Sequence, residues 1–368
     1  NKHGIMMMAG ALRLATAVST VAVWTHGAAL TEVPTERSAD KWITGLVAAV
    51  YSPISASGNQ SVNMDLASID AQAKYLNETH VGTAFVCGTT GESVDLTIEE
   101  RMALAEAWVG PANKYGLKLM VHVGTDSVVD GRALAVHAAS IGAWGIAAMP
   151  PTYLKPPGID ELVQTMAYVA GGAPRLPFYY YHIPSMTGVT FKMAEFIAAL
   201  DAAHAIPNFN GVKFTDSDLV DLLLCVQSTV HEKSPNMLYG TDGQLLSALV
   251  LGVHGAVGST YNFNGAVEGR VVEAVGRGDL PAAVEAQLDV ATFLSDVYGA
   301  VPGVNSGKVL MNLIGKARGG GLNVGPPRLP GHQPTSEEVA LVHTAALAWC
   351  SAAKVPAPWC ADLRKLRG

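Results

Sequence analysis

Residues 82–124 read GTAFVCGTTGESVDLTIEERMALAEAWVGPANKYGLKLMVHVG, and this stretch contains the pattern that decides the fold. An apolar run rich in Val and Phe (82–88) is followed by residues with helical spacing (97–115). A second apolar run (118–124) comes next. A strand, a helix and a strand in this order predict a βαβ unit, whose two strands lie parallel in one sheet.

The same alternation extends in both directions along the chain. Including the two runs above, the predicted strands are 45–53, 82–88, 118–124, 144–150, 177–184, 209–216, 237–242 and 255–262. Eight βα units fit a closed (β/α)8 TIM barrel better than an open sheet. The fold class we expect is therefore α/β, with a barrel over residues 43–264.

The pattern becomes purely helical after residue 264. Residues 280–300, 305–316 and 335–350 have helical spacing, and the Gly- and Pro-rich stretch 318–334 is typical of a loop. We expect three helices appended to the barrel, in a C-terminal helical region over residues 265–368.

The first 42 residues form a separate N-terminal extension in this interpretation. An apolar stretch from Leu14 to Trp24 is too short to span a bilayer comfortably but suits the core of a signal peptide. An extension that stays attached is the alternative. Cys350 and Cys360 can close a small loop by a disulfide, and together with two N-glycosylation sequons they favour secretion slightly.

Composition argues against several classes of function. The formal net charge is −7 and basic residues form no run, so nucleic-acid binding is not expected. Eleven histidines are present, but without the spacing of a metal site. We expect neither a metal nor another cofactor, and no membrane partner for a mature chain.

A lysine stands where a buried strand is predicted. Lys213 lies in GVKFTD (211–216), at the carboxyl end of the sixth strand, where a barrel enzyme places its active site. Burial disfavours an ammonium group, and a neutral amine attacks a carbonyl carbon to form a Schiff base. The alternative is a lysine at the rim whose amine reaches water or Asp216.

Two further motifs follow strand ends. GTTGES (88–93) combines a Gly-rich turn with the hydroxyls of Thr89 and Thr90, which suits the carboxylate of a 2-oxo acid. In FYYYHIPSMTG (178–188), alternation places Tyr179 and Tyr181 on one face of the strand. Tyr181, near the strand end, is the candidate for proton transfer. Local capping and core packing are the plain alternatives for these residues.

In this order and spacing, GTTGES, FYYYHIPSMTG, GVKFTD and GAVGSTYN closely resemble the N-acetylneuraminate lyases of the dihydrodipicolinate synthase superfamily. The resemblance covers residues 43–330, and more loosely the last helix. It implies a Schiff-base (class I) aldolase, usually a homotetramer, that cleaves sialic acid reversibly to pyruvate and N-acetylmannosamine. It also implies a cytoplasmic enzyme, whereas the N-terminal apolar stretch leaves the secretory pathway open.

The resemblance assigns roles residue by residue. Lys213 matches the Schiff-base lysine, Tyr181 the proton-relay tyrosine, and Thr89 with Thr90 the pair that holds the pyruvate carboxylate. The residues that bind the sugar in relatives match Thr215, Gly240, Asp242 and Ser259. Tyr153 matches an aromatic residue that lies near the site or at a subunit contact in relatives.

One position departs from the family pattern. Sialic acid lyases usually carry an acidic residue directly after the aspartate that matches Asp242, whereas this chain has Gly243. Loss of one charged hydrogen-bonding group costs roughly 1.5–3 kcal/mol if nothing replaces it. The preferred sugar therefore differs, or Gln244 or a water molecule compensates.

Three alternatives stay open at this stage. Dihydrodipicolinate synthase holds a second carboxylate with an arginine in the segment that aligns with YHIPSMTG. Met186 stands at that position, and a thioether cannot pair with a carboxylate. Sugar-acid aldolases and 4-hydroxy-2-oxoglutarate aldolase share the lysine and the threonine pair. A non-catalytic keto-acid binder is the alternative from a different class.

Overall fold

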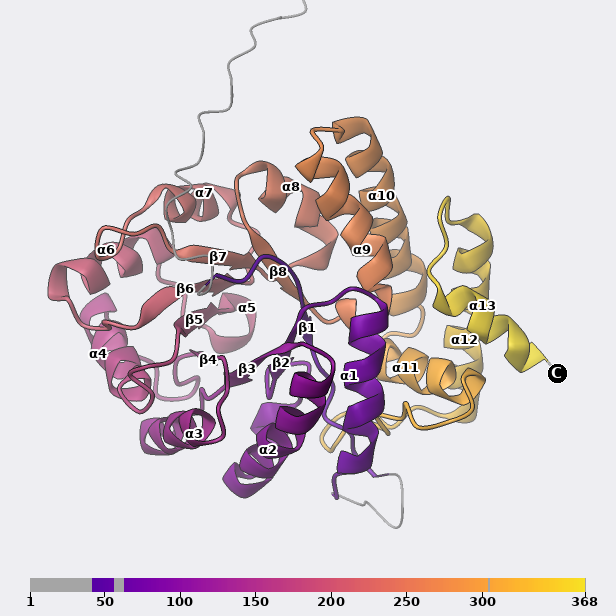
Figure 1. Ribbon diagram of the computed structural model, residues 1–368, viewed down its shortest axis with the longest axis horizontal. Coiled ribbons are helices and arrows are strands. Elements are labelled where there is room, and N and C mark those ends of the chain that lie inside the picture. Colours follow the sequence, from indigo (N-terminus) through magenta and orange to yellow (C-terminus); the bar gives the residue numbers. More distant parts are fainter. Residues whose placement is uncertain (1–41, 56–62, 304, 368) are drawn as a thin grey trace, which may run out of the picture. The chain divides into compact units, whose positions relative to one another are not determined.

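Eight parallel strands close into a barrel in the computed structural model (Figure 1), which describes residues 42–55, 63–303 and 305–367. Each strand pairs with the next, and β8 pairs with β1. The strands are β1 (Gly45–Ala49), β2 (Thr83–Val86), β3 (Lys118–His122), β4 (Gly145–Ala148), β5 (Phe178–His182), β6 (Phe209–Phe214), β7 (Asn236–Tyr239) and β8 (Gly255–Gly258). The predicted TIM barrel is confirmed, and each strand is shorter than predicted because the last residues predicted for it belong to the loop or helix that follows.

The chain divides by its contacts after Ala39, and the fold described here is that of the unit from Asp40 onward. The predicted extension over residues 1–42 and its signal-peptide interpretation lie outside the described residues, except for Trp42. One of the two sequons (59–61) also lies outside them. Among the described helices, none has both the length and the apolar character needed to cross a bilayer.

Helices alternate with the strands and surround the barrel. They are α1 (Ile69–Glu78), α2 (Ile98–Lys114), α3 (Val128–Ser140), α4 (Ile159–Ala170), α5 (Pro184–Thr187), α6 (Met193–Ala203), α7 (Leu219–Gln227), α8 (Leu245–Val250) and α9 (Tyr261–Gly276). Their starts follow the sequence: Thr97 caps α2 through a capping box with Glu100, whose side chain accepts from the Thr97 N–H.

Alternation along the strands creates two apolar layers. Tyr179 and Tyr181 of β5 lie in the cluster inside the barrel, whereas Phe178 and Tyr180 pack in the layer between strands and helices. The predicted faces of this strand are confirmed. A position that points inward near a carboxyl end therefore faces the mouth of the barrel.

Among the described residues, four α-helices follow α9, one more than the three predicted. They are α10 (Leu280–Phe293), α11 (Ser306–Ala317), α12 (Ser336–Ala352) and α13 (Trp359–Leu363), and Figure 1 shows them gathered on one side of the barrel, next to α9. The unpredicted helix α13 has only five residues, too few to show a helical period in the sequence.

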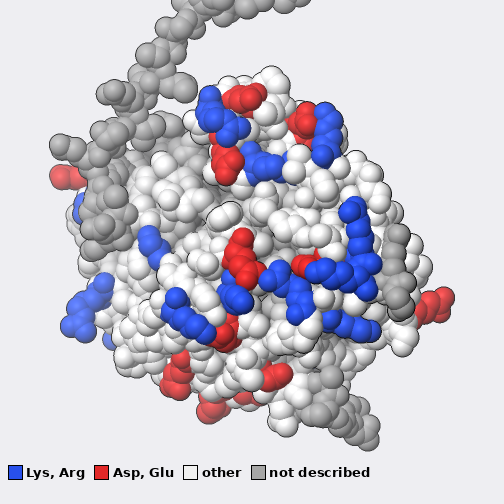
Figure 2. Space-filling model, turned by 45° about the vertical axis from the view of Figure 1, so that its right-hand side comes forward, with Lys and Arg blue, Asp and Glu red and all other residues white. Residues whose placement is uncertain are grey.

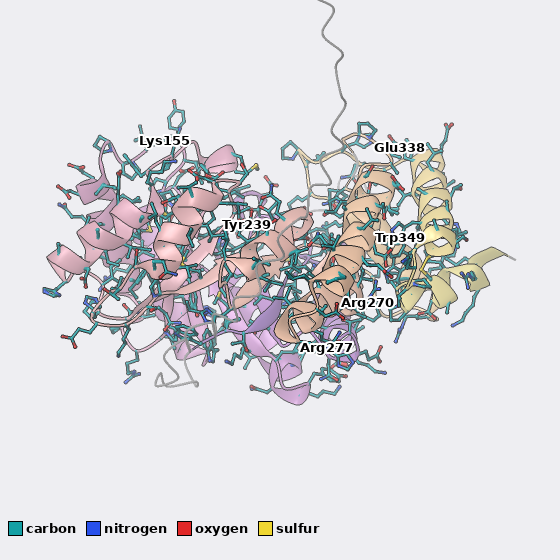
Figure 3. All side chains as sticks on the ribbon, turned by 90° about the horizontal axis from the view of Figure 1, so that it is seen from above. Lys155, Tyr239, Arg270, Arg277, Glu338 and Trp349 are labelled. Carbon is teal, nitrogen blue, oxygen red and sulfur yellow. A yellow bond between two sulfur atoms is a disulfide. The ribbon has the colours of Figure 1, made fainter. Side chains whose placement is uncertain are left out.

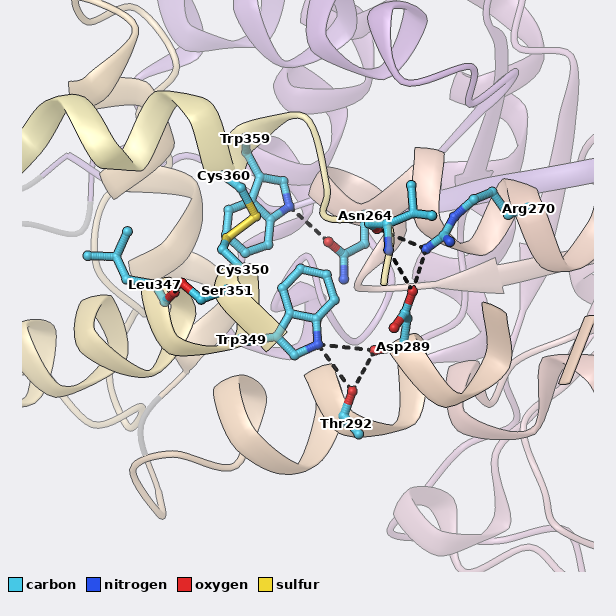
Figure 4. Close-up of a disulfide and its surroundings, with 11 residues drawn as sticks. Asn264, Arg270, Asp289, Thr292, Leu347, Trp349, Cys350, Ser351, Trp359 and Cys360 are labelled. Atoms are coloured by element: carbon cyan, nitrogen blue, oxygen red, sulfur yellow. Dashed lines mark hydrogen bonds and ion pairs between the residues drawn. A yellow bond between two sulfur atoms is a disulfide. The ribbon is translucent and has the colours of Figure 1, made fainter. Parts of the chain in front are cut away.

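Cys350 of α12 and Cys360 of α13 form the disulfide that the sequence suggested (Figure 4). Beside it, the rings of Trp349 and Trp359 stack with centroids 5.6 Å apart. The Trp359 indole N–H donates to Asn264 Oδ1 of α9 at 2.8 Å. The disulfide and this hydrogen bond attach the last two helices to the helix that follows β8.

Surface charge is mixed on the face drawn in Figure 2, where Lys and Arg side chains lie beside Asp and Glu side chains. Elsewhere in the described residues, the exposed side chains of Lys354 and Glu285 form an ion pair of this kind. The chain has a net charge of −7, and on the face drawn in Figure 2 the mixed charges of the described residues form no continuous basic surface that could bind a polyanion.

Candidate active site

Lys213 lies inside the barrel near the carboxyl end of β6. Its strand neighbours are Tyr181 of β5 and Leu238 of β7, and only 4% of the residue is exposed. The amine nitrogen Nζ lies 3.7 Å from the ring centroid of Tyr181 and 4.4 Å from that of Phe85. Within the part of the chain that the structure describes, no carboxylate lies within ion-pairing distance of this amine. The alternative in which the Lys213 amine pairs with Asp216 is therefore wrong. The Asp216 carboxylate approaches His182 instead.

Tyr181 links the lysine to the turn after β2. Its hydroxyl lies 3.1 Å from Oγ1 of Thr89, and its ring meets those of Phe85 and His122 edge to face. These two rings fix the orientation of a side chain that is 2% exposed. The three candidates Lys213, Tyr181 and Thr89 therefore meet at one place, although they come from three strands.

The turn that carries Thr89 and Thr90 is tightly shaped. Thr89 is exposed and Thr90 half-buried, so the threonine pair borders open space. Ser52 donates from its hydroxyl to the Gly91 carbonyl at 2.5 Å. A Cβ on Gly91 would lie 3.1 Å from the carbonyl oxygen of Val50, so a side chain there would push the turn away from β1.

A buried ion pair with a helix of the C-terminal region holds this turn. Lys308 of α11 lies 2.6 Å from a carboxylate oxygen of Glu92, and it also donates to the Ser52 carbonyl at 3.1 Å. The other Glu92 oxygen accepts from the backbone N–H of Arg328. Burial lowers the pKa of Lys308 while the Glu92 carboxylate opposes that effect. Sequence analysis missed Lys308; the signal available was a lysine on the apolar face of an amphipathic helix.

The opposite side of the mouth carries Asp242, which is 8% exposed. One of its oxygens accepts from the backbone N–H and the hydroxyl of Thr260, at 3.1 and 2.5 Å. Burial raises the pKa of Asp242, and the hydrogen bonds from Thr260 oppose that rise. A Cβ on Gly258 would approach Asp242 Oδ1 to 2.1 Å, so the absence of a side chain there makes room for the carboxylate.

A second carboxyl group, that of Glu268, lies behind Asp242. It is fully buried, and its Oε1 lies 2.8 Å from Thr260 Oγ1. A threonine hydroxyl has one hydrogen and cannot donate to both carboxylates, so one carboxyl must itself carry a proton. Burial, followed by the charge of Asp242, raises the pKa of Glu268 well above its usual value, so the proton belongs there. Sequence analysis did not single out Glu268.

The remaining predicted substrate residues lie around the same rim. The hydroxyl of Thr215 is buried without a hydrogen-bond partner among the described residues. A Cβ on Gly240 would lie 1.9 Å from this hydroxyl oxygen, so glycine is required beside it. Ser259 accepts a hydrogen bond from Tyr298 at 3.2 Å.

Tyr153 is far more exposed than Lys213, Tyr181 and Asp242. Its side chain is 85% exposed, and the loop that carries it is held by Asp126, which accepts from the backbone N–H groups of Thr152 and Tyr153. Figure 3 shows Lys155 of the same loop on one side of the molecule and Arg277, just after α9, on the opposite side. Because this loop follows β4, it marks the side of the barrel on which the strands end.

His122 has a structural role. It donates from Nδ1 to the Cys87 carbonyl at 2.8 Å, and its Nε2 accepts from the Met149 N–H at 3.3 Å. Burial and nearby positive charge lower the pKa of His122 well below the usual value, which keeps the ring neutral. Both nitrogens are used, so the ring serves to support Tyr181.

Comparison with known proteins agrees with this geometry. Residues 43–345 match the dihydrodipicolinate synthetase family. The chain is 43% identical to an N-acetylneuraminate lyase of Xenopus tropicalis over 293 residues, which cover 79% of this chain and 92% of the relative. A mouse (Mus musculus) N-acetylneuraminate lyase is 40% identical over 82% of this chain and 90% of its own length.

Solved structures of N-acetylneuraminate lyases are also similar to this chain. The N-acetylneuraminate lyase of Proteus mirabilis superposes with a TM-score of 0.75 and 32% identity, covering 85% of this chain and 99% of that one. The sialic acid aldolase of Aliivibrio salmonicida gives a TM-score of 0.74 and 33% identity, covering 85% and 98%. The chain therefore belongs to the dihydrodipicolinate synthetase family, as the resemblance of its strand-end motifs to the N-acetylneuraminate lyases predicts.

Proposed function

We propose that this protein cleaves N-acetylneuraminate reversibly to pyruvate and N-acetylmannosamine through a Schiff base on Lys213. Relatives at 40–43% identity carry the name of this activity over most of the chain. The observation that carries the proposal is the convergence of three groups: the Lys213 amine, the Tyr181 hydroxyl and the Thr89 hydroxyl.

The first half of the reaction builds an electron sink. The Lys213 amine adds to the C2 ketone of the open-chain sugar acid, and loss of water leaves an iminium ion. The hydroxyls of Thr89 and Thr90 hold the substrate carboxylate at the mouth of the barrel, which fixes C2 over the amine.

The second half breaks the carbon–carbon bond. As Tyr181 takes the proton of the C4 hydroxyl, it passes its own phenolic proton to the substrate carboxylate. The C3–C4 bond then opens and its electron pair moves to the iminium, giving an enamine and the aldehyde of N-acetylmannosamine. The proton held by the carboxylate returns through Tyr181 to C3 of the enamine, and hydrolysis of the resulting imine releases pyruvate and restores the free amine. This scheme uses no metal or other cofactor.

The rest of the rim would bind the sugar chain. Thr215, Gly240, Asp242 and Ser259 follow the ends of β6, β7 and β8, and a carboxylate such as Asp242 would accept from the paired hydroxyls of a polyol. The exposed side chain of Tyr153 is suited to a contact with another subunit in the proposed homotetramer. We also propose three regions in the chain: an N-terminal extension over residues 1–42, the barrel over 43–264 and a C-terminal helical region over 265–368. The second boundary falls inside α9, so the C-terminal region continues directly from the last helix of the barrel.

The test is pyruvate release from a panel of N-acetylneuraminate, shorter 2-oxo sugar acids and 4-hydroxy-2-oxoglutarate, with borohydride trapping of pyruvate followed by mass spectrometry. We expect turnover with the sialic acid and a covalent adduct that disappears in Lys213→Ala. Preference for a shorter acid would transfer the assignment to another pyruvate-dependent aldolase. A chain that forms no adduct and releases no pyruvate is a keto-acid binder.

A further inference from the structure

A group of side chains suited to metal binding lies on the amino side of the barrel, away from the catalytic rim. Asp201 and His204 come from the end of α6, and His231 comes from the turn that precedes β7. Because α6 leads into β6 and this turn leads into β7, all three residues lie where strands begin. The opposite end of the barrel carries Lys213 and the threonine pair.

The three side chains converge. One ligand atom from each of them (a carboxylate oxygen and two imidazole nitrogens) lies within 4.8 Å of the other two. The imidazole rings of His204 and His231 stack with centroids 5.7 Å apart and planes 23° from parallel. His204 is exposed and the other two are partly exposed, so an ion can enter from solvent.

The contacts of His231 hold its ring beside Asp201. Its Nε2 lies 3.4 Å from the Ile206 carbonyl oxygen, and its Nδ1 lies 3.5 Å from Asp201 Oδ1. The same Oδ1 accepts the backbone N–H of His231 at 2.7 Å, which fixes the carboxylate against the turn. A carbonyl bound to the second ring nitrogen is the usual arrangement around a metal-bound histidine.

Backbone conformation gives a second argument. His204 ends α6 with φ +47°, and His231 and Glu232 are the central pair of the turn 230–233 with φ +49° and +64°. Val230 and Lys233 bridge that turn through two backbone hydrogen bonds. Glycine and asparagine are the favoured residues at both kinds of position. Both histidines thus occupy positions that most residue types other than Gly, Asn, Asp and His rarely adopt.

We propose that Asp201, His204 and His231 bind one divalent transition-metal ion of the Zn²⁺ type, with solvent in the fourth position. Imidazole and carboxylate are ligands that Zn²⁺ accepts in tetrahedral geometry. The ion joins the end of α6 to the turn before β7 and stabilises the amino side of the barrel. It takes no part in the aldol chemistry, so this inference does not depend on the proposed function.

The test uses the full chain, dialysed against a chelator and then titrated with ZnCl2 by calorimetry, with melting temperatures measured in parallel. We expect one ion per chain and a melting temperature that rises with Zn²⁺ concentration. Pyruvate release should be the same with and without Zn²⁺.

Matched variants locate the ion. His204→Asn and His231→Asn remove the imidazole but keep a residue that tolerates positive φ, and each should weaken Zn²⁺ binding by at least about tenfold. His137→Asn is the control, since His137 with Glu106 offers only one imidazole and one carboxylate. The proposal fails if the wild-type chain binds no Zn²⁺, or if both cluster variants bind it as tightly as the wild type. Loss of binding in His137→Asn alone would place the ion elsewhere and equally overturn it.

Discussion

The hydroxyl of Tyr181 lies 3.1 Å from Oγ1 of Thr89, although 92 residues separate the two in the chain. This contact joins the end of β5 to the turn after β2, across the mouth of the barrel. It places the proposed proton-transfer group between the hydroxyl that would hold a carboxylate and the Lys213 amine, 3.7 Å from the ring of the same tyrosine. A carboxylate bound at Thr89 would therefore lie within reach of the phenol that we propose moves the proton.

Tyr181→Phe removes the proton carrier and keeps the ring that packs against Lys213. The turnover rate for N-acetylneuraminate should fall by about 10²–10⁴-fold, the usual contribution of a positioned acid or base. Borohydride trapping of pyruvate on Lys213 should persist, because the amine is intact. Steady-state kinetics and adduct mass check the two halves separately. Near-normal turnover in this variant would remove Tyr181 from the mechanism.

Lys308→Met tests the ion pair behind the threonine turn. Removing one member of a buried pair leaves the Glu92 carboxylate uncompensated, and we expect a loss of about 3–5 kcal/mol in the free energy of unfolding. The KM for pyruvate should rise as well, since Lys308 also binds the carbonyl of Ser52, whose hydroxyl holds the turn.

Glu92→Gln completes a double-mutant cycle with Lys308→Met. The two losses in the free energy of unfolding should add to clearly more than the loss in the double variant, because both single changes break one interaction. Urea denaturation measures all four proteins. Additive losses would mean that the pair does not act as a unit.

Gly243→Glu restores the acidic residue that sialic acid lyases usually carry after the aspartate. Its φ lies outside the left-handed region, and a Cβ there would meet Leu294 Cδ1 at 3.2 Å, which a small shift relieves. Gln244 does not replace the missing acid with its oxygen, which accepts from the Tyr239 hydroxyl at 2.5 Å.

If the full sialic acid is bound through its glycerol tail, Gly243→Glu should lower its KM by about tenfold, the effect of one charged hydrogen bond. Gly243→Ala is the control for the added Cβ and should leave KM unchanged. Competition assays between N-acetylneuraminate and a shorter 2-oxo sugar acid check the shift in preference. An unchanged preference in Gly243→Glu would show that the tail does not reach this position.

Glu268→Gln tests the proton assigned to the buried carboxyl. The folded chain keeps this proton, whereas the unfolded chain loses it above the ordinary pKa of about 4.3. The folded state then binds more protons, so the free energy of unfolding falls as pH rises from there towards the raised pKa. An amide keeps a hydrogen for Thr260 Oγ1 and does not titrate. The stability advantage of wild type over Glu268→Gln should therefore shrink with rising pH in urea denaturation. A difference that stays constant would assign the proton elsewhere.

Cys350→Ser with Cys360→Ser tests the cross-link between α12 and α13. The bond spans a sequence separation of 10, and its loss should lower the free energy of unfolding by about 2–3 kcal/mol. Dithiothreitol should lower the melting temperature of the wild type and leave that of the double variant unchanged. Cys87 and Cys225 are buried free thiols and serve as internal controls.

The periodicity of apolar residues in the sequence predicts the barrel well but the C-terminal helices less well. Eight apolar runs separated by helical spacing specify parallel strands, because each strand buries both faces and each helix buries one. The short helix α13 escapes this argument, since five residues give no measurable period. The predicted site follows from the fold in the same way: Lys213 and Tyr181 lie near the ends of β6 and β5 and Thr89 lies in the turn after β2, so closure of the barrel brings them to one mouth.

The strand order, the inward face of β5 and the residue types at the carboxyl ends can be read from the chain alone, because they depend on local alternation and on the geometry of parallel strands. The groups that support these residues from behind become visible only in the folded molecule. Lys308 reaches Glu92 from a helix far along the chain, Thr260 links Asp242 to Glu268, and Asp201 meets two histidines at the other end of the barrel. These contacts join residues that lie far apart in the sequence at no regular spacing, so no local sequence pattern predicts them. The partners meet only when the helices pack.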